Sequence, residues 1–528
     1  MMELWNVVKY YIRKIYEFLA RPFTEDFAML LLISILVCVP TIWGGYIIDK
    51  NALSSVAWEA AHNFILCYFA MFLITCIPLR AIKRVGKGLL VLLAVIDFMI
   101  EIACWKTKGC GFSNDIVAIT LATNIKETHE FVGTYISYSY LISIVVSIIC
   151  LFGVVKKMAP MINRVGCKIA KFACVIIFIS CGYFVLKGSE SWQYKFYNKI
   201  VAFVSYDLPP DLRDYKKSLK LEFSKADIPQ YIVLVLGESF SRSHSSLYGY
   251  EKETNPFLSI LRDSSALCVY DNALAPATHT IPCVKSIMST YKAEYRDSIN
   301  WYECVSLPQV MSEIGYKTIW ISNQSPSGVY DNVAARYAQL CDTTIYVGNK
   351  YVGVGKTDLD AKVLDVIRED HILNTNDNCF IVIHLMGSHS SYSNRYPLEW
   401  SKFSSADYMR CLENQRQVLA EYDNSVLYND FVVSEIFKIL SDKECISYYF
   451  SDHSLDLFES SDNYFGYAKE NNNLSKKASL SIPYMIFGSP SFRNNFPTEW
   501  YNIKSNASNT IYTEDTIQYI MDMLGVKF

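Results

Sequence analysis

The side chains best suited to chemistry follow two apolar runs that lie far apart in the chain. Glu238 comes after the run 231–236, and Asp452 and His453 come after the run 446–450. Both runs predict buried strands. Ligands in open α/β sheets bind beyond the carboxyl ends of strands, so the three side chains are expected to converge there. Two carboxylates and an imidazole are a donor set that a divalent metal such as zinc accepts.

Two further predicted strands also end in polar residues. The strand 318–322 leads to Asn323, and the strand 380–385 carries His384 and leads to His389. One polar strand end is ordinary loop chemistry, but four in one domain predict an active site at one edge of a sheet. Strands that alternate with helical segments, the longest at about 412–440, predict a mostly parallel sheet with helices on both faces.

A candidate nucleophile lies in the turn-rich stretch 275–289. It contains Thr278 and Thr280 and leads into a predicted helix over 282–290, which starts at Pro282. A hydroxyl at a helix N-terminus is favoured by the helix dipole when it becomes an alkoxide or carries a phosphate. Metal coordination would lower its pKa and activate it. The residues alone leave both threonines open, either as nucleophile or as simple helix caps.

Length and composition indicate a membrane domain ahead of these elements. The chain has 528 residues, 51% of them hydrophobic, and the apolar excess lies before about residue 187. A membrane-spanning helix needs roughly 20 apolar residues. We predict five spans and three regions: a transmembrane domain at 1–187, a linker or interfacial helix at 188–228, and an extracytoplasmic catalytic domain at 229–528. The expected spans are Phe27–Ile48, Ala57–Leu79, Gly88–Trp105, Tyr140–Val155 and Ala170–Leu186.

Charge sets the expected orientation and excludes one class of partner. Lys and Arg are concentrated before the first span, between the second and third, and between the fourth and fifth. The positive-inside rule then predicts a cytoplasmic N-terminus and an outer catalytic domain. A net charge of −3 gives no indication of a nucleic-acid partner.

An odd number of cysteines follows residue 188, none in a CxxC pair, so a disulfide framework is not predicted.

These motifs together resemble those of a membrane phosphoethanolamine transferase of the alkaline phosphatase/sulfatase superfamily, the type that modifies lipid A. The likeness covers nearly the whole chain. The matching segments are Gly237-Glu238-Ser239-Phe240-Ser241-Arg242, Gly249-Tyr250, Thr254-Asn255-Pro256, Ile383–His389, Asn394–Pro397, Glu421–Ser425 and Ser451-Asp452-His453.

The resemblance implies roles for individual residues. Glu238, Asp452 and His453 match zinc ligands, and Thr280 matches a nucleophile that also contacts the metal. His389 matches a substrate-site histidine with a catalytic or phosphate-binding role, and Asn323 matches a polar substrate-site residue. His384 is included as a substrate-binding candidate, although its place on a strand is also typical of a core residue.

The resemblance also implies a reaction and a location. Zn²⁺ is the expected cofactor, phosphatidylethanolamine the expected donor, and a surface glycolipid such as lipid A or the lipopolysaccharide core the expected acceptor. The group would pass through a phospho-threonine intermediate. The expected location is the bacterial inner membrane, as a multi-pass protein with a periplasmic catalytic domain, and the expected consequence is polymyxin resistance.

Two departures from the family pattern leave a second metal site and the acceptor pocket open. Ser327 stands where the family often has Lys, and the stretch 464–467 lacks a second His. A glycerol-phosphate transferase of the lipoteichoic-acid-synthase type, which shares the architecture and the metal, and a sulfatase-fold phosphodiesterase are kept as alternatives. A sulfatase is disfavoured because Thr280 cannot become formylglycine. A non-catalytic membrane sensor or scaffold is disfavoured because the whole ligand set is present.

Overall fold

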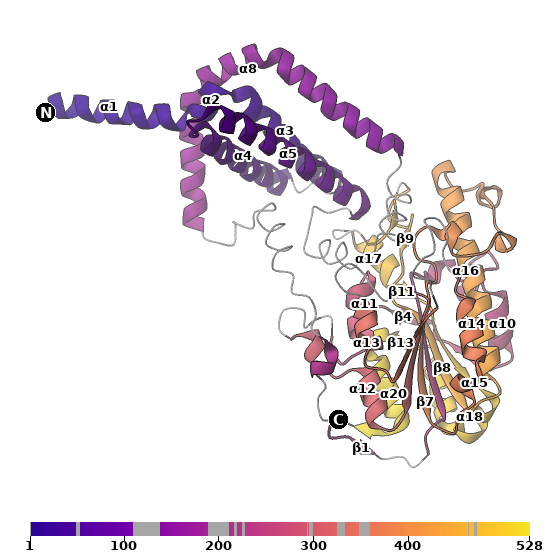
Figure 1. Ribbon diagram of the computed structural model, residues 1–528. Coiled ribbons are helices and arrows are strands. Elements are labelled where there is room, and N and C mark those ends of the chain that lie inside the picture. Colours follow the sequence, from indigo (N-terminus) through magenta and orange to yellow (C-terminus); the bar gives the residue numbers. More distant parts are fainter. Residues whose placement is uncertain are drawn as a thin grey trace. The chain divides into compact units, whose positions relative to one another are not determined.

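The computed structural model describes residues 2–48, 53–108, 138–187, 211–215, 219–223, 227–292, 294, 299–324, 333–347, 359–462, 464–468 and 472–527. These residues form two compact units, one with the helices up to Lys187 and one with the residues from 211 onward (Figure 1). Most of the predicted linker at 188–228, and the family departure at Ser327, lie outside the described residues.

The N-terminal unit is helical. Its described helices are α1 (Met2–Leu19), α2 (Arg21–Glu25), α3 (Phe27–Ile48), α4 (Leu53–Thr75), α5 (Arg80–Lys108) and α8 (Tyr138–Lys187). Three of them are long and apolar enough to cross a membrane, with windows at Phe27–Gly44, Arg80–Lys106 and Tyr140–Ala170, and the apolar part of α4, Ala60–Thr75, is shorter. The unit has its own apolar core, in which residues of α2 and α3 pack with residues of α4, α5 and α8.

The predicted count of five spans is not confirmed. The fourth and fifth predicted spans both lie on α8, a single helix of 50 residues. The basic stretch between them was expected to form a loop, but Lys and Arg are good helix formers and the helix runs through it. Figure 1 shows that α8 bends, and Pro160 inside it is the usual cause of such a kink.

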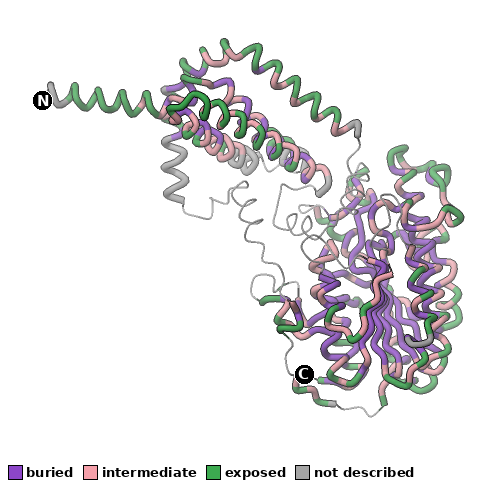
Figure 2. Tube along the Cα trace, in the orientation of Figure 1, coloured by how far each residue is buried: buried purple, intermediate pink, exposed green. Residues whose placement is uncertain are grey.

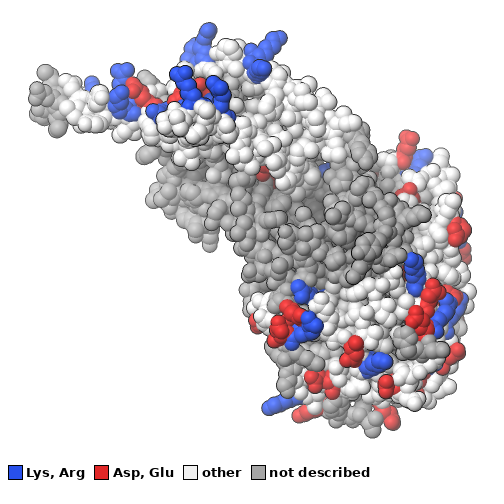
Figure 3. Space-filling view, in the orientation of Figure 1, with Lys and Arg blue, Asp and Glu red and all other residues white. Residues whose placement is uncertain are grey.

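The charged side chains of the helical unit are concentrated near α2. Lys83 lies 3.1 Å from Glu25, and Lys87 pairs with Asp26, so the start of α5 is held against α2. Asn163 of α8 accepts a hydrogen bond from the backbone N–H of Ala28 at 2.7 Å. Figure 3 shows Lys and Arg gathered at the end of the unit that carries α2, while the rest of the visible helical surface is mostly uncharged.

The C-terminal unit is built on a seven-stranded sheet. The strand order is β3 (Leu267–Val269), β12 (Tyr484–Gly488), β8 (Cys445–Ser451), β2 (Tyr231–Gly237), β7 (Cys379–His384), β5 (Lys317–Ser322) and β6 (Thr343–Tyr346). Only β12 runs antiparallel to its neighbours in this sheet. The predicted α/β fold with a mostly parallel sheet is confirmed.

Helices cover both faces of the sheet, as alternation along the strands requires. On β2, Ile232, Leu234 and Leu236 enter one core, and Tyr231, Val233 and Val235 enter the other. Figure 2 shows the strands of this sheet as a buried layer with helices on both sides. The first core is closed by α11 (Thr280–Ile287), α12 (Leu307–Glu313), α13 (Val333–Ala338) and α20 (Thr516–Leu524). The second is closed by α10 (Pro256–Asp263), α14 (Lys362–Arg368), α15 (Asp370–Leu373) and α16 (Glu413–Leu440).

Short elements complete the unit. A second sheet has the order β11 (Ser481–Ile482), β4 (Asn272–Leu274), β13 (Thr510–Tyr512). Two antiparallel pairs join β9 (Asp456–Leu457) to β10 (Phe465–Gly466), and β1 (Glu222–Phe223) to β14 (Val526–Lys527). The remaining α-helices among the described residues of this unit are α17 (Asn473–Leu480), α18 (Pro490–Asn495) and α19 (Pro497–Ser505).

Candidate metal and nucleophile site

The candidate ligands meet because their strands are neighbours. In the register of β2 and β8, Gly237 pairs with Ser451, so Glu238 and Asp452 leave the same edge of the sheet side by side. The backbone N–H of Asp452 donates to the carbonyl of Gly237 at 3.1 Å. One ligand atom each from Glu238, Asp452 and His453 lie within 4.8 Å of one another, and all three residues are buried. The structure therefore brings together the three residues that the sequence predicted as metal ligands.

Thr280 is the hydroxyl that reaches this cluster. Its Oγ1 lies 3.3 Å from each carboxylate oxygen of Glu238 and 3.2 Å from Nε2 of His453. Helix α11 begins at Thr280, two residues earlier than predicted, so the hydroxyl sits in the first turn of the helix. The residue pattern alone left Thr278 open and the resemblance pointed to Thr280; in the structure the contacts with Glu238 and His453 belong to Thr280.

The orientation of His453 suits a metal ligand. Its Nδ1 lies 2.9 Å from the carbonyl oxygen of Ser454, which can only accept, so Nδ1 carries the proton. In the neutral imidazole, the form that binds a metal, Nε2 then presents its lone pair to the cluster, 3.3 Å from Glu238 Oε1 and 3.5 Å from Asp452 Oδ2. A backbone carbonyl that fixes the far nitrogen is the arrangement found around metal-bound histidines.

Asp452 provides the sharpest test of whether a metal fits. Its Oδ1 accepts hydrogen bonds from the backbone N–H groups of Ser239 at 3.2 Å and His453 at 2.7 Å. Its Oδ2 is buried and, within the described part of the chain, accepts no hydrogen bond. A buried carboxylate oxygen without a donor is costly unless a cation satisfies it. The donor set of two carboxylates, one imidazole and one hydroxyl thus fits a divalent cation, and zinc in particular.

The three groups perturb one another strongly. Burial raises the pKa of Glu238, but the hydrogen bond from His453 and the charges of His453 and His389 outweigh it and hold that pKa below its usual range. Burial and the neighbouring Glu238 charge raise the pKa of Asp452. Burial lowers the pKa of His453, but Asp452 and Glu238 together raise it above its usual value. Such opposed shifts in one buried cluster are typical of functional sites.

The other predicted site residues lie around this cluster. Asn323 follows β5, is buried, and donates from Nδ2 to Asp360 Oδ1 at 2.7 Å. His389 is half-buried in the loop after β7, and its charge contributes to the low pKa of Glu238. His384 is only 2% exposed, its ring packs edge-on against Trp320, and burial lowers its pKa to about 4. His384 therefore has the surroundings of a core residue, and its predicted substrate role stays a prediction.

Sequence reasoning missed three residues that support the site. The buried carboxylate of Asp360 accepts from Asn323 and from the backbone N–H groups of Met386 and Gly387, each of these at 2.8 Å, so it joins the loops after β5 and β7. Ser239 donates its hydroxyl to Glu238 Oε1 at 2.8 Å, and Gln324 donates to Glu238 Oε2 at 3.4 Å. Ser239 and Gln324 each stand beside a predicted site residue, and Ser239 also lies in the segment 237–242 that carries the resemblance; the sequence offers no further signal for them. Asp360 offered none.

Fold and site together define an α/β protein that has a cluster of potential metal ligands and a threonine hydroxyl at the carboxyl edge of its sheet. Residues 230–526 match the sulfatase family. The chain belongs to this family, as the resemblance predicted.

Within this family, the chain is similar to curated phosphoethanolamine transferases. Phosphoethanolamine transferase EptC of Escherichia coli (strain K12) is 28% identical over 279 residues, which are 52% of this chain and 47% of that protein. Phosphoethanolamine transferase EptA of Helicobacter pylori is 28% identical over 280 residues, which are 51% of this chain and 50% of that one. The chain thus spans about half the length of these relatives.

Two solved structures share the fold. The C-terminal periplasmic domain of EptC from Escherichia coli, in complex with Zn, is 25% identical, with a TM-score of 0.53 over 58% of this chain and 86% of that one. The integral membrane protein lipooligosaccharide phosphoethanolamine transferase A from Neisseria meningitidis is 16% identical, with a TM-score of 0.66 over 95% of this chain and 96% of that one. The second likeness extends the shared fold to the apolar N-terminal helices.

Proposed function

We propose that this chain transfers phosphoethanolamine from phosphatidylethanolamine to a surface glycolipid through a covalent intermediate on Thr280. The observation that carries the proposal is the position of Thr280 Oγ1, 3.2–3.3 Å from atoms of Glu238 and His453 and at the start of α11. The phosphoethanolamine transferases among its relatives support the choice of the group transferred.

The residues of the cluster have distinct tasks in this reaction. Glu238, Asp452 and His453, with Thr280, would hold a zinc ion, and the Zn complex of the EptC domain supports that choice of metal. When bound, zinc lowers the pKa of a coordinated hydroxyl and offsets the charge of a phosphoryl group. The dipole at the start of α11 favours the negative charge that develops on Thr280 and on the phosphate it receives.

The transfer balances in two displacements. Thr280 Oγ loses its proton and forms a bond to phosphorus, while the phosphorus–oxygen bond to the glycerol carbon chain breaks and diacylglycerol leaves with a proton. An oxygen of the acceptor then bonds to the same phosphorus, and the Thr280–phosphorus bond breaks to restore the hydroxyl. His389, half-buried beside Glu238, is proposed to bind the phosphoryl group or to carry the proton, and Asn323 and His384 remain proposed substrate residues.

Membrane attachment fits the donor. Helices that are long and apolar enough to cross a membrane support an enzyme that meets a lipid donor on one surface. We propose the bacterial inner membrane with the catalytic unit on the periplasmic side, where lipid A or lipopolysaccharide core is the acceptor and polymyxin resistance the consequence.

Trapping the intermediate tests the proposal. The full chain in detergent is incubated with phosphatidylethanolamine, and its intact mass and tryptic peptides are measured, with Thr280→Ala and Thr278→Ala as matched variants. We expect one phosphoethanolamine group on the peptide that contains residues 278–283 in the wild type and in Thr278→Ala. Thr280→Ala should carry no adduct while it keeps its zinc content and melting temperature.

Other outcomes have definite meanings. An adduct in Thr280→Ala but not in Thr278→Ala would move the nucleophile to Thr278. A glycerol-phosphate adduct from phosphatidylglycerol, with none from phosphatidylethanolamine, would place the protein with the lipoteichoic-acid-synthase type. Release of free phosphoethanolamine with no adduct would indicate a phosphodiesterase.

A further inference from the structure

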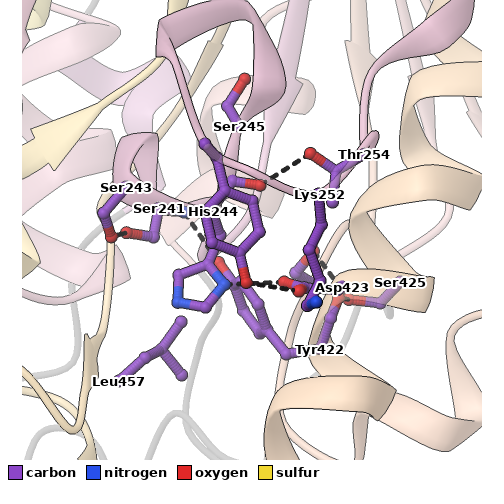
Figure 4. Close-up of polar contacts among 12 residues, drawn as sticks. Ser241, Ser243, His244, Ser245, Lys252, Thr254, Tyr422, Asp423, Ser425 and Leu457 are labelled. Carbon is purple, nitrogen blue, oxygen red and sulfur yellow. Dashed lines mark hydrogen bonds and ion pairs between the residues drawn. The ribbon is translucent and has the colours of Figure 1, made fainter. Parts of the chain in front are cut away.

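A tyrosine hydroxyl on α16 closes the turn that follows Glu238. The Tyr422 hydroxyl accepts a hydrogen bond from the backbone N–H of Ser241 at 2.7 Å and donates one to the carbonyl of Ser239 at 2.7 Å. Figure 4 shows Tyr422 and Ser241 within the same group of polar contacts. The phenol therefore bridges two backbone groups that the turn itself leaves unsatisfied. Tyr422 belongs to the segment 421–425 that the sequence marked as part of the resemblance, yet the reaction gives it no task.

Ser239, inside this turn, touches both carboxylates of the metal cluster. Its backbone N–H donates to Asp452 Oδ1 at 3.2 Å, and its hydroxyl donates to Glu238 Oε1 at 2.8 Å. Its φ is 56°, in the left-handed region that only glycine adopts without cost. Such a conformation persists only where the surroundings hold it. Ser239 can aim both acids only while the turn keeps this shape.

The ring of Tyr422 is itself held firmly. The side chain is fully buried, and its ring makes edge contacts with His244, at 5.2 Å between centroids, and with Tyr392, at 5.0 Å. His244 Nδ1 in turn lies 2.7 Å from Asp423 Oδ1, also on α16. A buried aromatic ring wedged in this way has few alternative rotamers, so its hydroxyl is a fixed point for the turn.

We propose that Tyr422 is a positioning residue for the metal cluster: its hydroxyl holds Ser239 in the left-handed turn that aims Glu238 and Asp452 at the cation. This inference rests on the metal site of the proposed function and not on the identity of the donor lipid. Tyr422 has no contact with substrate in this role, and it acts through Ser239 alone.

The test compares two tyrosines that differ in position and not in chemistry. Tyr231 is also buried, donates its hydroxyl to a backbone carbonyl, that of Leu373, at 2.6 Å, and lies at the opposite end of β2. Tyr422→Phe and Tyr231→Phe therefore each remove one buried phenol oxygen. Zinc dissociation constants are measured on the full chain in detergent by competition with a chelator, and melting temperatures are measured without metal.

We expect both variants to melt at a lower temperature without metal, but only Tyr422→Phe to bind zinc more weakly, by about 10- to 100-fold, the range seen when a residue that orients a metal ligand is changed. Equal zinc affinity in the two variants would overturn the inference and leave Tyr422 with a structural role only.

A second comparison tests the route through Ser239 and does not depend on how stable Tyr422→Phe is. Glycine adopts a positive φ freely, so in a Ser239→Gly background the turn needs less support. We expect Tyr422→Phe to weaken zinc binding less in that background than in the wild type, a coupling that a double-mutant cycle measures. If the effects of the two substitutions on zinc affinity are additive, Tyr422 does not act through Ser239. A wild-type chain that binds no zinc would overturn the inference together with the metal site, whereas zinc binding without a lipid adduct would overturn the proposed transfer alone.

Discussion

At the scale of single residues, the candidate metal cluster depends on how closely the backbone of one loop approaches that of another. Gly387, in the loop after β7, has a φ of +51° and lies directly against the backbone of Glu238. Its neighbour Ser388 donates its N–H to the carbonyl of Glu238 at 2.9 Å, and Gly387 donates its own N–H to Asp360 at 2.8 Å. The position of Glu238 is thus fixed from the β7 side as well as from the Tyr422 side.

Substitution of this glycine should damage both stability and metal binding. A Cβ on Gly387 would lie 2.7 Å from the carbonyl oxygen of Glu238 and 2.9 Å from its nitrogen, closer than real contacts allow. We expect Gly387→Ala to lower the free energy of unfolding by about 2–4 kcal/mol, through strain and a backbone shift, and to weaken zinc binding. Chemical denaturation and chelator competition measure the two effects.

Gly315→Ala is a control that has backbone strain from a positive φ but no steric clash of the added Cβ. Gly315 also has a positive φ, +89°, but no atom lies within 4 Å of the position of its added Cβ. We expect this control to cost about 1 kcal/mol and to leave zinc affinity unchanged. If Gly387→Ala binds zinc as tightly as the control, the loop after β7 does not position Glu238.

The residues that could be predicted from the sequence are those that follow strands with a strong apolar signal. Glu238, Asp452 and His453 were found because runs of buried residues end just before them. The residue pattern alone could not separate Thr280 from Thr278, because both lie near the start of the same helix; the resemblance pointed to Thr280, and its hydroxyl is the one that contacts the cluster. Asp360 could not be found at all, because its partners lie on loops that the sequence does not bring together.

At the scale of elements, α16 is the helix that supports the loops on which the site residues lie. Tyr422 holds the turn after β2, and Ser425 donates its hydroxyl to Ser388, in the loop after β7, at 3.0 Å. Asp423 accepts from Tyr250 at 2.7 Å and from Tyr408, and it pairs with His244 on the short 3₁₀ helix η3 (Arg242–His244). Buried polar contacts of this density bind η3 firmly to α16.

The pair of His244 and Asp423 should make stability depend on pH in a defined direction. Burial lowers the pKa of His244, but the charge and hydrogen bond of Asp423, with a smaller effect of Glu459, raise it above the usual value of 6.5. A raised histidine pKa stabilises the fold fully below pH 6.5, and this stabilisation is lost as the pH rises through the pKa of the folded state. We therefore expect the melting-temperature difference between wild type and His244→Gln to shrink as pH rises from 6 toward 9.

The comparison between the two proteins at each pH removes the titration of groups that they share. Thermal melts in one buffer series of constant ionic strength supply the measurement. A difference that stays constant or widens with rising pH would show that His244 is neutral in the folded protein at pH 6.

Helices and strands were predicted well where the spacing of apolar residues and the length of the segment indicate the same element. They were predicted poorly where strong helix formers connect two apolar runs. The four strands predicted at 231–236, 318–322, 380–385 and 446–450 are all present, and their alternating contacts with two cores explain why their signal is strong. The strands β3 and β6 were missed because they are short. The basic stretch in α8 was mistaken for a loop because charge sets the position of a segment relative to a membrane but does not break a helix.

At the scale of the whole molecule, the two units have separate cores. The two clusters that flank the sheet draw all their buried members from residue 212 onward, and the helical cluster draws its members from residues 20–177. Strand β1, near the start of the C-terminal unit, pairs with β14 near its end, which ties the two ends of that unit together. We therefore expect the C-terminal unit to fold alone and the helices to serve another purpose.

We expect that purpose to be access to a lipid donor. A chain that starts at residue 211 should fold and bind zinc with the affinity of the full protein, because all four candidate ligands and their supports are retained. Its transfer from phosphatidylethanolamine in vesicles should fall by about 100-fold or more, because enzyme and donor no longer share one surface and the gain in effective concentration is lost. Transfer from a short-chain, water-soluble phosphatidylethanolamine should change little, because that donor reaches both forms through solution. Rates on the two donors, measured for both forms at equal zinc occupancy, give the comparison. An equal loss on both donors would mean that the helices shape the catalytic site itself, and no loss on either would mean that the catalytic unit takes its donor from the membrane without them.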